Sequence, residues 1–275
     1  SALCSDEVFM GILVLKGGNA LNLAYNISTR GSIDIDFSIE GDFSEDEKNR
    51  MQNQAEYLLN AEFEKENMKV FDVKFYERPT KIAESVKEFW GGYKLDFKLI
   101  EIDKYKSYYD DIEKQRREAL SVGKKGSTVF TVDISKYEYV AKRKTKDLDG
   151  AIVQVYSPEM ICLEKLRAIC QQTNEYKDII KSMSIRPRAR DFYDIINLTE
   201  SFMLNFKSED NVKLAELIFK AKRVPLNFIA LISNYYEFHL NDWESVIQTI
   251  EQNTEVKSFD YYYERVRNEF NHLIS

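Results

Sequence analysis

Polar and apolar residues alternate in three stretches of the first half of the chain, the pattern of strands with one buried face. These stretches cover residues 32–39, 70–76 and 93–100. Ser44 followed by Glu47 forms a capping box and predicts a helix from there to about residue 66. The same half contains a charged helical pattern near residues 107–120 and strand-like pieces at 128–134 and 152–156. We therefore expect a sheet accompanied by a few helices.

The pattern changes after Ser157-Pro158-Glu159. Ser157 can cap a helix, Pro158 suits the first helical position and Glu159 complements the helix dipole. From there to the end, apolar residues recur at helical spacing and no stretch has convincing strand character. The sequence predicts an α+β protein, with a mixed-sheet domain at 1–156 and an all-α helical bundle domain at 157–275.

Composition narrows the class of protein. The chain has 275 residues, of which 44% are hydrophobic and 31% charged, and this excludes a disordered or low-complexity chain. The longest uncharged apolar stretch, residues 8–15, is much shorter than the about 20 residues of a membrane helix. Three scattered cysteines do not form a disulfide framework, and acidic Asp6 and Glu7 stand where a secretory signal would be basic. We expect a cytoplasmic protein with reduced thiols and no membrane partner.

Asp34 and Asp36 are the sharpest chemical feature of the sequence. Residues i and i+2 of a strand face the same side, so both carboxylates would project together. Two close negative charges repel each other unless a cation lies between them, and carboxylate oxygens suit Mg²⁺. For an isolated Asp-x-Asp, an exposed polar strand face is the better explanation, so the pair alone does not decide the function.

Two further features strengthen the case for a phosphate-handling site. Asp96 lies on the stretch 93–100, where Leu95 and Phe97 face the opposite side, and we expect it to join the pair from an adjacent strand. Three such acids can hold two metal ions for attack at a phosphate. Gly17-Gly18 follow an apolar run and precede a helical pattern, so their backbone N–H groups can cradle phosphates. Gly-Gly alone is more often a turn, but its order before the Asp-x-Asp is more specific.

Four short motifs follow one another between about residues 13 and 198. They are Lys16-Gly17-Gly18-Asn19-Ala20-Leu21 with Arg30-Gly31-Ser32-Ile33-Asp34-Ile35-Asp36-Phe37; Gly91-Gly92-Tyr93-Lys94-Leu95-Asp96-Phe97-Lys98; Ser157-Pro158-Glu159 with Glu164-Lys165-Leu166-Arg167-Ala168; and Arg190-Asp191-Phe192-Tyr193-Asp194. Together they resemble the AbiEii/AbiGii family of nucleotidyltransferase-like toxins, within the DNA polymerase β-like nucleotidyltransferase superfamily.

The resemblance implies an activity, cofactors and partners. It implies a nucleotidyltransferase that moves a nucleoside monophosphate from an NTP to an RNA acceptor such as a tRNA 3′ end, with two Mg²⁺ ions. It also implies the toxin of a bacterial toxin–antitoxin or abortive-infection system, with a cognate antitoxin as partner. Some relatives are known mainly as NTP binders, so the alternative class is a catalytically weak NTP-binding or protein-interaction module that keeps the fold.

The resemblance also implies roles for single residues. Asp34, Asp36 and Asp96 correspond to the catalytic metal ligands. The triphosphate pocket would be lined by Lys16, Gly17, Gly18, Asn19, Arg30 and Ser32. From the helical domain, Lys165 would reach the nucleotide and Asp191 would fill the last polar position, with Asp194 as its neighbour.

One residue departs from the family pattern, and several roles have ordinary structural alternatives. The family usually has Ser or Thr after Gly-Gly, whereas this chain has Asn19, whose longer amide would place a phosphate differently. Lys165 could instead be an exposed helix residue paired with Glu164 or Glu159. Asp191 and Asp194 could simply bridge to Arg188 or Arg190.

Charge supplies the argument for an RNA acceptor. The formal charge is 39 − 46 = −7, so a polyanion must bind at a local basic surface. One basic tract consists of Lys114, Arg116, Arg117, Lys124, Lys125, Lys136, Lys142, Arg143, Lys144 and Lys146. A second tract consists of Lys181, Arg186, Arg188 and Arg190. We expect the tracts to form the two walls of the cleft between the domains; a solvated charged face is the alternative for either one.

Overall fold

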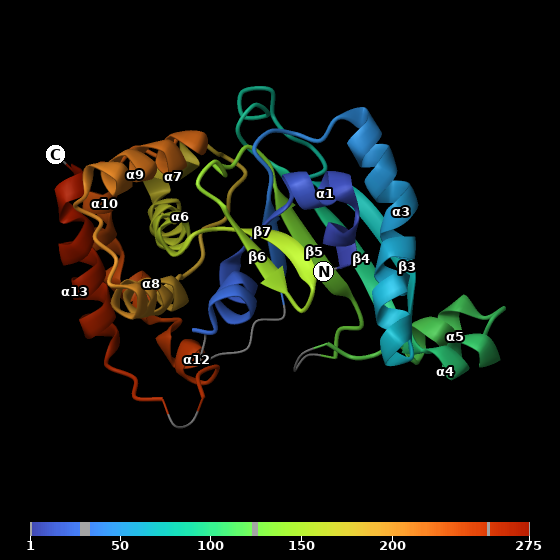
Figure 1. Cartoon of the computed structure of the whole chain (residues 1–275). Coiled ribbons are helices and arrows are strands. Elements are labelled where there is room, and N and C mark those ends of the chain that lie inside the picture. The colour runs from blue at the N-terminus through green and yellow to red at the C-terminus, as the bar shows by residue number, and fades with distance from the viewer. Residues whose placement is uncertain (1, 28–33, 123–125, 252–253, 275) are drawn as a thin grey trace.

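A mixed seven-stranded sheet forms one half of the molecule, and a group of helices forms the other (Figure 1). This computed structural model describes residues 2–27, 34–122, 126–251 and 254–274. The strands are β1 (Val14–Lys16), β2 (Ile35–Ser38), β3 (Met68–Arg78), β4 (Gly92–Glu101), β5 (Phe130–Ser135), β6 (Lys144–Leu148) and β7 (Ala151–Val155). Their order across the sheet is β3-β4-β5-β2-β1-β7-β6.

The centre of the sheet combines both strand orientations. β2 is antiparallel to β1 and parallel to β5, while β5 is antiparallel to β4. Polar and apolar residues alternate along β2, β4 and β5, so this part of the sheet has one apolar and one polar face. On β4 and β5 the apolar face holds Leu95, Phe97, Val132 and Ile134, all buried, whereas Asp133 on the other face is half-buried.

The helices of the sheet half cover mainly one side of it (Figure 1). They are η1 (Ala2–Ser5), α1 (Glu7–Ile12), α2 (Gly17–Asn19), η2 (Ala20–Ala24), α3 (Glu45–Phe63), η3 (Glu64–Glu66), α4 (Ile102–Ser107) and α5 (Ile112–Arg117). The predicted capping box is confirmed, because Ser44 accepts from the Glu47 N–H and Glu47 accepts from the Ser44 N–H. Met51, Ala55, Leu58 and Leu59 bury the inner side of α3 against the rest of the core.

The second half of the described chain contains helices and no strand after β7. Its elements are α6 (Pro158–Cys170), α7 (Asn174–Lys177), α8 (Ala189–Phe202), α9 (Glu209–Ala221), α10 (Phe228–Leu231), η4 (Ile232–Tyr235), α11 (Tyr236–Leu240), α12 (Trp243–Ile247), α13 (Phe259–Phe270) and η5 (Asn271–Ile274). Ser157 caps α6 by accepting from the Met160 N–H, as predicted. The α+β class with a helical second half is confirmed.

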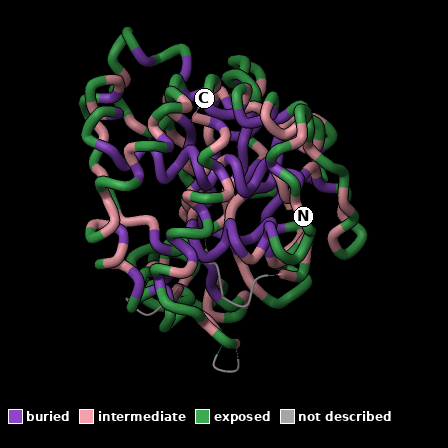
Figure 2. The backbone as a smooth tube through the Cα atoms, turned by 90° about the vertical axis from the view of Figure 1, so that its left-hand side faces the viewer, coloured by how far each residue is buried: buried purple, intermediate pink, exposed green. Residues whose placement is uncertain are grey.

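One hydrophobic core runs through both halves (Figure 2). It joins sheet residues such as Val14 and Val155 to helix residues such as Leu163 and Phe192. The division into separate domains at residue 157 therefore stays a prediction, although the change from strands to helices occurs there.

Two local expectations differ from the structure. The helical pattern at 107–120 contains only the short helix α5, and α4 ends where this segment begins. The strand β6 was not predicted, because Lys144-Thr145-Lys146-Asp147-Leu148 lacks an apolar face. Cys4, Cys162 and Cys170 are buried and unpaired. A search of the described helices finds none with the length and apolar character to cross a membrane.

Candidate functional site

Gly17 lies directly against the carboxylate of Asp36. β1 ends at Lys16, which is level with Asp36 on β2, and Gly17 begins the helical turn that follows. Gly17 has a φ of +69°, a left-handed conformation that favours glycine, and a Cβ there would lie 2.6 Å from Asp36 Oδ2. Both the backbone turn and the close approach therefore require glycine at this position.

The pKa of Asp36 is raised from 3.8 to about 6, chiefly because the carboxylate is buried. The Lys16 ammonium lowers this pKa, while the neighbouring acids Glu164, Asp133 and Asp34 each raise it. The carboxylate pair of Asp34 and Asp36 faces one cavity, as the alternation along the strand predicted. A cation near these oxygens would relieve the repulsion that disfavours their charged form.

Asp96 is two strands away from Asp36. β5 lies between β4 and β2, so the prediction that the strands of Asp96 and Asp36 are adjacent is wrong. Asp36 is level with Asp133 on β5, whereas Asp96 is level with Thr131. At about 4.8 Å per strand, the lateral separation of Asp36 and Asp96 is roughly 10 Å. Asp96 also has partners, because Tyr76 and Thr131 each donate to it at 2.7 Å.

Asp133 is level with Asp36 on the neighbouring strand β5 but lines an adjoining cavity and not the cavity of Asp34 and Asp36, and sequence analysis did not single it out. It lies beside Asp36 on the same face of the sheet, and Lys94 Nζ lies 3.0 Å from its Oδ1. The sequence held a signal, because Val132 and Ile134 flank Asp133 as Ile35 and Phe37 flank Asp36. That alternation identifies a strand with one polar face but does not say which strands are neighbours.

The carboxylates open into a cavity of about 240 Å³ between the sheet and the helices. Its lining consists of Lys16, Gly17, Gly18, Asp34, Asp36, Glu164, Lys165, Arg188, Arg190 and Asp191. Seven of the predicted site residues are thus brought together: Lys16, Gly17, Gly18, Asp34, Asp36, Lys165 and Asp191. Arg30 and Ser32 lie outside the described residues, and Asn19 and Asp96 do not line this cavity.

Lys165 is fixed from the helical half by two carboxylates. Its Nζ lies 2.8 Å from Asp191 and 2.8 Å from Asp194, and all three side chains are buried. Burial opposes the charge of Lys165, but Asp191 and Asp194 outweigh it, so its pKa is raised. The alternative of an exposed Lys165 paired with Glu164 or Glu159 is wrong. Asp191 also accepts from Arg188, so the bridge that the sequence left open is present too.

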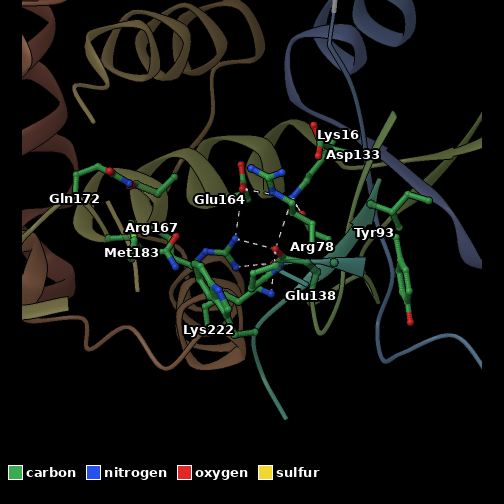
Figure 3. A pocket seen from close by; sticks show the side chains of 18 of the residues that line it. Lys16, Arg78, Tyr93, Asp133, Glu138, Glu164, Arg167, Gln172, Met183 and Lys222 are labelled. Atoms are coloured by element: carbon green, nitrogen blue, oxygen red, sulfur yellow. Dashed lines mark hydrogen bonds and ion pairs between the residues drawn. The ribbon is translucent and has the colours of Figure 1, made fainter. Parts of the chain in front are cut away.

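Lys16 sits in a second buried ionic cluster. Its Nζ lies 3.6 Å from Glu138 and 3.7 Å from Glu164, and it donates to Ser135 Oγ at 3.1 Å. Burial opposes its charge, yet Glu138 and Glu164 together raise its pKa. Figure 3 shows this cluster in a neighbouring cavity of about 380 Å³, where Arg167 and Lys222 approach Glu138 from the helical half. This cavity adjoins the first through Lys16, Glu164 and Arg188.

Asn19 has a partner within the chain. Its amide Nδ2 donates to the backbone carbonyl of Asp34 at 2.6 Å, and so holds the start of the carboxylate strand against the glycine turn. A contact of Asn19 with phosphate stays a prediction, while positioning of Asp34 is what its observed hydrogen bond provides.

We expect Asn19→Ala to loosen this connection. Losing one hydrogen bond should lower the free energy of unfolding by about 0.5–1.5 kcal/mol, because the Asp34 carbonyl loses its amide donor. Denaturant unfolding of Asn19→Ala, Asn19→Ser and the parent would measure it. Equal stability of Asn19→Ala and the parent would contradict a positioning role. If Asn19→Ala loses NTP affinity but no stability, a contact between Asn19 and phosphate is favoured.

The donor set fits Mg²⁺ in its chemistry. In the part of the chain that the structure describes, no three His, Cys, Asp or Glu side chains converge as a complete metal cage. Mg²⁺ does not need one, since it commonly takes one or two carboxylates, water and substrate phosphates. The raised pKa of Asp36, with acids around it, is the observation that favours a cation there.

The first basic tract does not form one wall of the cleft, so that prediction is wrong. Lys114 and Arg116 lie on α5 near the β3 edge, where Arg116 pairs with Asp72, and Lys144 and Lys146 lie on β6 at the other edge (Figure 1). The second tract is at the site: Arg188 and Arg190 line the carboxylate cavity.

The chain is similar to one protein family and to several solved structures. The family model described as "Nucleotidyl transferase AbiEii toxin, Type IV TA system" matches residues 1–265. No curated protein matches the sequence. Among solved structures, JHP933 from Helicobacter pylori is similar with a TM-score of 0.46 and 14% identity, covering 99% of this chain and 86% of that one. An antigenic nucleotidyltransferase-like protein from Paracoccidioides brasiliensis has a TM-score of 0.35 and 17% identity, covering 90% and 89%.

Proposed function

Since this chain belongs to the AbiEii family of nucleotidyl transferase toxins, we propose that it transfers a nucleoside monophosphate from an NTP to the 3′ hydroxyl of an RNA with the help of Mg²⁺. The observation that carries the proposal is the cavity in which Gly17 touches Asp36 and the helical half contributes Lys165 and Arg190. It combines a phosphate-binding turn, carboxylates and cations in one space. A tRNA 3′ end is the acceptor that we favour.

The metal-binding residues in this proposal are Asp34 and Asp36, which line the same cavity. Asp133 lies beside Asp36 on β5 and lines the adjoining cavity, so it replaces Asp96 as the proposed third acid. Bound Mg²⁺ would neutralise phosphate charge and favour ionisation of the attacking hydroxyl. The chain's own contribution is to hold these oxygens on one rigid sheet face, which costs no rearrangement during the reaction.

The remaining residues bind and orient the nucleotide. The backbone at Gly17-Gly18 offers N–H groups to phosphate oxygens, and the missing side chain lets a phosphate approach Asp36 closely. Arg190 is exposed and makes no hydrogen bond or ion pair in the described chain, so its guanidinium is available for phosphate. Lys165 lines the same cavity, but Asp191 and Asp194 balance its charge and fix its position. The Arg190 guanidinium would stabilise a leaving pyrophosphate.

Incubation with each labelled NTP tests the proposal. The protein is combined with Mg²⁺ or EDTA and with total RNA, purified tRNA or total protein, and labelled products are separated. We expect Mg²⁺-dependent label on RNA from one preferred NTP. Stabilisation by NTP without any product would favour the alternative, a nucleotide-binding module, and label on protein would reject the RNA acceptor while keeping the transfer.

The family also implies a cognate antitoxin as partner, and we propose that expression of this chain alone slows growth of a bacterial host. Asp36→Asn is the matched control, because it removes the proposed chemistry and keeps the fold. Equal growth inhibition by both proteins would show that nucleotidyl transfer is not the cause.

A further inference from the structure

The segment from Arg186 to Arg190, which leads into α8, is held by polar contacts with Gln172, His239 and Asp191. The Arg186 N–H donates to Gln172 Oε1 at 2.8 Å, and the Arg188 N–H donates to His239 Nδ1 at 3.0 Å. The Arg188 side chain pairs with Asp191. Burial lowers the pKa of His239 to about 4, so at neutral pH the ring is uncharged and its Nδ1 can accept. The loop backbone is thus held in one shape.

This fixed loop leaves two arginines without a partner. Arg186 and Arg190 are exposed, and neither side chain makes a hydrogen bond or ion pair in the described chain. Both line a cavity of about 330 Å³ whose other wall is formed around α12 by Asp242, Ser245, Val246 and Thr249. A chain that orders a loop and leaves its cations unpaired has formed a site for an anion.

The arginine cavity adjoins the carboxylate cavity. The two share Arg188, Arg190 and Asp191, whereas the cavity of Figure 3 adjoins the carboxylates through Lys16, Glu164 and Arg188. In phosphoryl transfer the attacking and leaving oxygens lie roughly in line with the phosphorus, so two substrates must approach the carboxylates from different sides. Two further cavities adjoin the carboxylate cavity, and apart from Arg188 they do so through different residues.

The residues that line the cavity of Figure 3 and the arginine cavity indicate which of the two substrates each cavity binds. Around the cavity of Figure 3, Glu138 already pairs with Arg167 and Lys222, and Trp90 and Met183 contribute apolar surface. That cavity suits a nucleoside better than a second anion. Around the arginine cavity Arg188 is paired, but Arg186 and Arg190 are exposed and have no ion pair within the described residues, as a phosphodiester requires.

We infer that the arginine cavity binds a phosphate of the acceptor RNA next to its 3′ end, with Arg186 as a contact that serves the acceptor and not the NTP. The inference rests on the proposed function for the identity of the acceptor. Arg186 lines only the arginine cavity of the two, whereas Arg190 lines both, so Arg186 is the residue that separates the substrates.

The test compares Arg186→Ala and Arg186→Lys with Lys213→Ala. Lys213 is an exposed cation on α9 that lines neither cavity, so its removal changes the net charge equally. Binding of a single-stranded RNA oligonucleotide with a free 3′ hydroxyl is measured over a salt series, and NTP binding is measured separately by thermal shift with Mg²⁺. We expect Arg186→Ala to weaken RNA binding roughly ten-fold and to lower the salt slope by about 0.7, with NTP binding unchanged and Arg186→Lys intermediate.

Each of the other outcomes contradicts either the RNA phosphate subsite or the proposed nucleotidyl transfer. RNA binding by Arg186→Ala within two-fold of Lys213→Ala would reject the phosphate subsite even if RNA is still labelled. If Arg186→Ala weakens NTP binding and leaves RNA binding unchanged, Arg186 contacts the triphosphate of the NTP and not the RNA. RNA binding that depends on Arg186 in a protein that transfers no nucleotide would reject the proposed function and keep the subsite.

Discussion

Asp36→Asn is expected to lower nucleotidyl transfer by roughly 10³-fold or more, because it removes the carboxylate at the centre of the proposed metal site. Initial rates of labelled product under saturating NTP and Mg²⁺ would measure the loss. Transfer within ten-fold of the parent would remove Asp36 from the reaction.

The same substitution should leave the fold intact or more stable. The pKa of Asp36 is raised from 3.8 to about 6, so its ionisation costs the folded protein stability as pH rises through that interval. Replacing it with Asn removes this cost, which amounts to about 3 kcal/mol at most above pH 6 in EDTA. Urea unfolding at pH 5 and pH 8 would test the sign: the gain should be larger at pH 8. A loss of stability at pH 8 would indicate a structural carboxylate.

Asp96→Asn is the matched control for this prediction. Tyr76 and Thr131 occupy the Asp96 carboxylate, and β5 separates it from Asp36, so transfer should remain within about three-fold of the parent. Asp133→Asn should resemble Asp36→Asn. The reverse result, loss with Asp96 and none with Asp133, would restore the assignment made from the sequence.

Features that depend on local patterns could be predicted from the sequence. The alternation around Asp34 and Asp36 placed both acids on one face, and Gly17-Gly18 was expected between an apolar run and a helical pattern, where the structure has the end of β1 and the start of α2. The capping box at Ser44 and the helix start at Ser157 are equally local, because each depends on residues within one helical turn. The fold class followed from the change of period at residue 157.

Features that depend on which strands pair with each other could not be predicted from the sequence. Asp96 and Asp133 both sit on strands with one polar face, and only the order β4-β5-β2 decides which one meets Asp36. The prediction that the first basic tract forms one wall of the cleft was wrong for the same reason. Its residues on α5 and β6 are close in sequence, but the whole sheet separates them. Periodicity describes each strand but says nothing about its neighbour.

The sequence analysis also did not predict the buried ionic cluster, whose central residue is Glu138. This residue follows β5, and nothing in its sequence neighbourhood distinguishes it from a surface acid. In the structure its side chain is 3% exposed and pairs with Arg167 at 2.7 Å, Lys16 at 3.6 Å and Lys222 at 3.6 Å. Arg167 and Lys222 come from the helical half and Lys16 from β1, so Glu138 joins the two halves beside the proposed phosphate site (Figure 3).

The second large prediction is therefore that Glu138→Gln destabilises the protein by about 3–5 kcal/mol, because removing one partner of a buried ion pair leaves the others charged in an apolar interior. Although burial opposes its charge, Arg167, Lys222 and Lys16 lower the pKa of Glu138 below its ordinary 4.5, so its contribution is complete above that pH and is lost as pH falls. Urea unfolding at pH 7 and pH 4 should show the difference between parent and variant shrinking at the lower pH.

Glu88→Gln is the control: Glu88 is 77% exposed and 3.8 Å from Arg223, so its loss should cost under about 1 kcal/mol. Adding Lys222→Met to Glu138→Gln should cost less than the two single changes together, because it removes a cation left unpaired. Additive costs, or a Glu138→Gln protein as stable as Glu88→Gln, would show that the cluster does not hold the helices to the sheet.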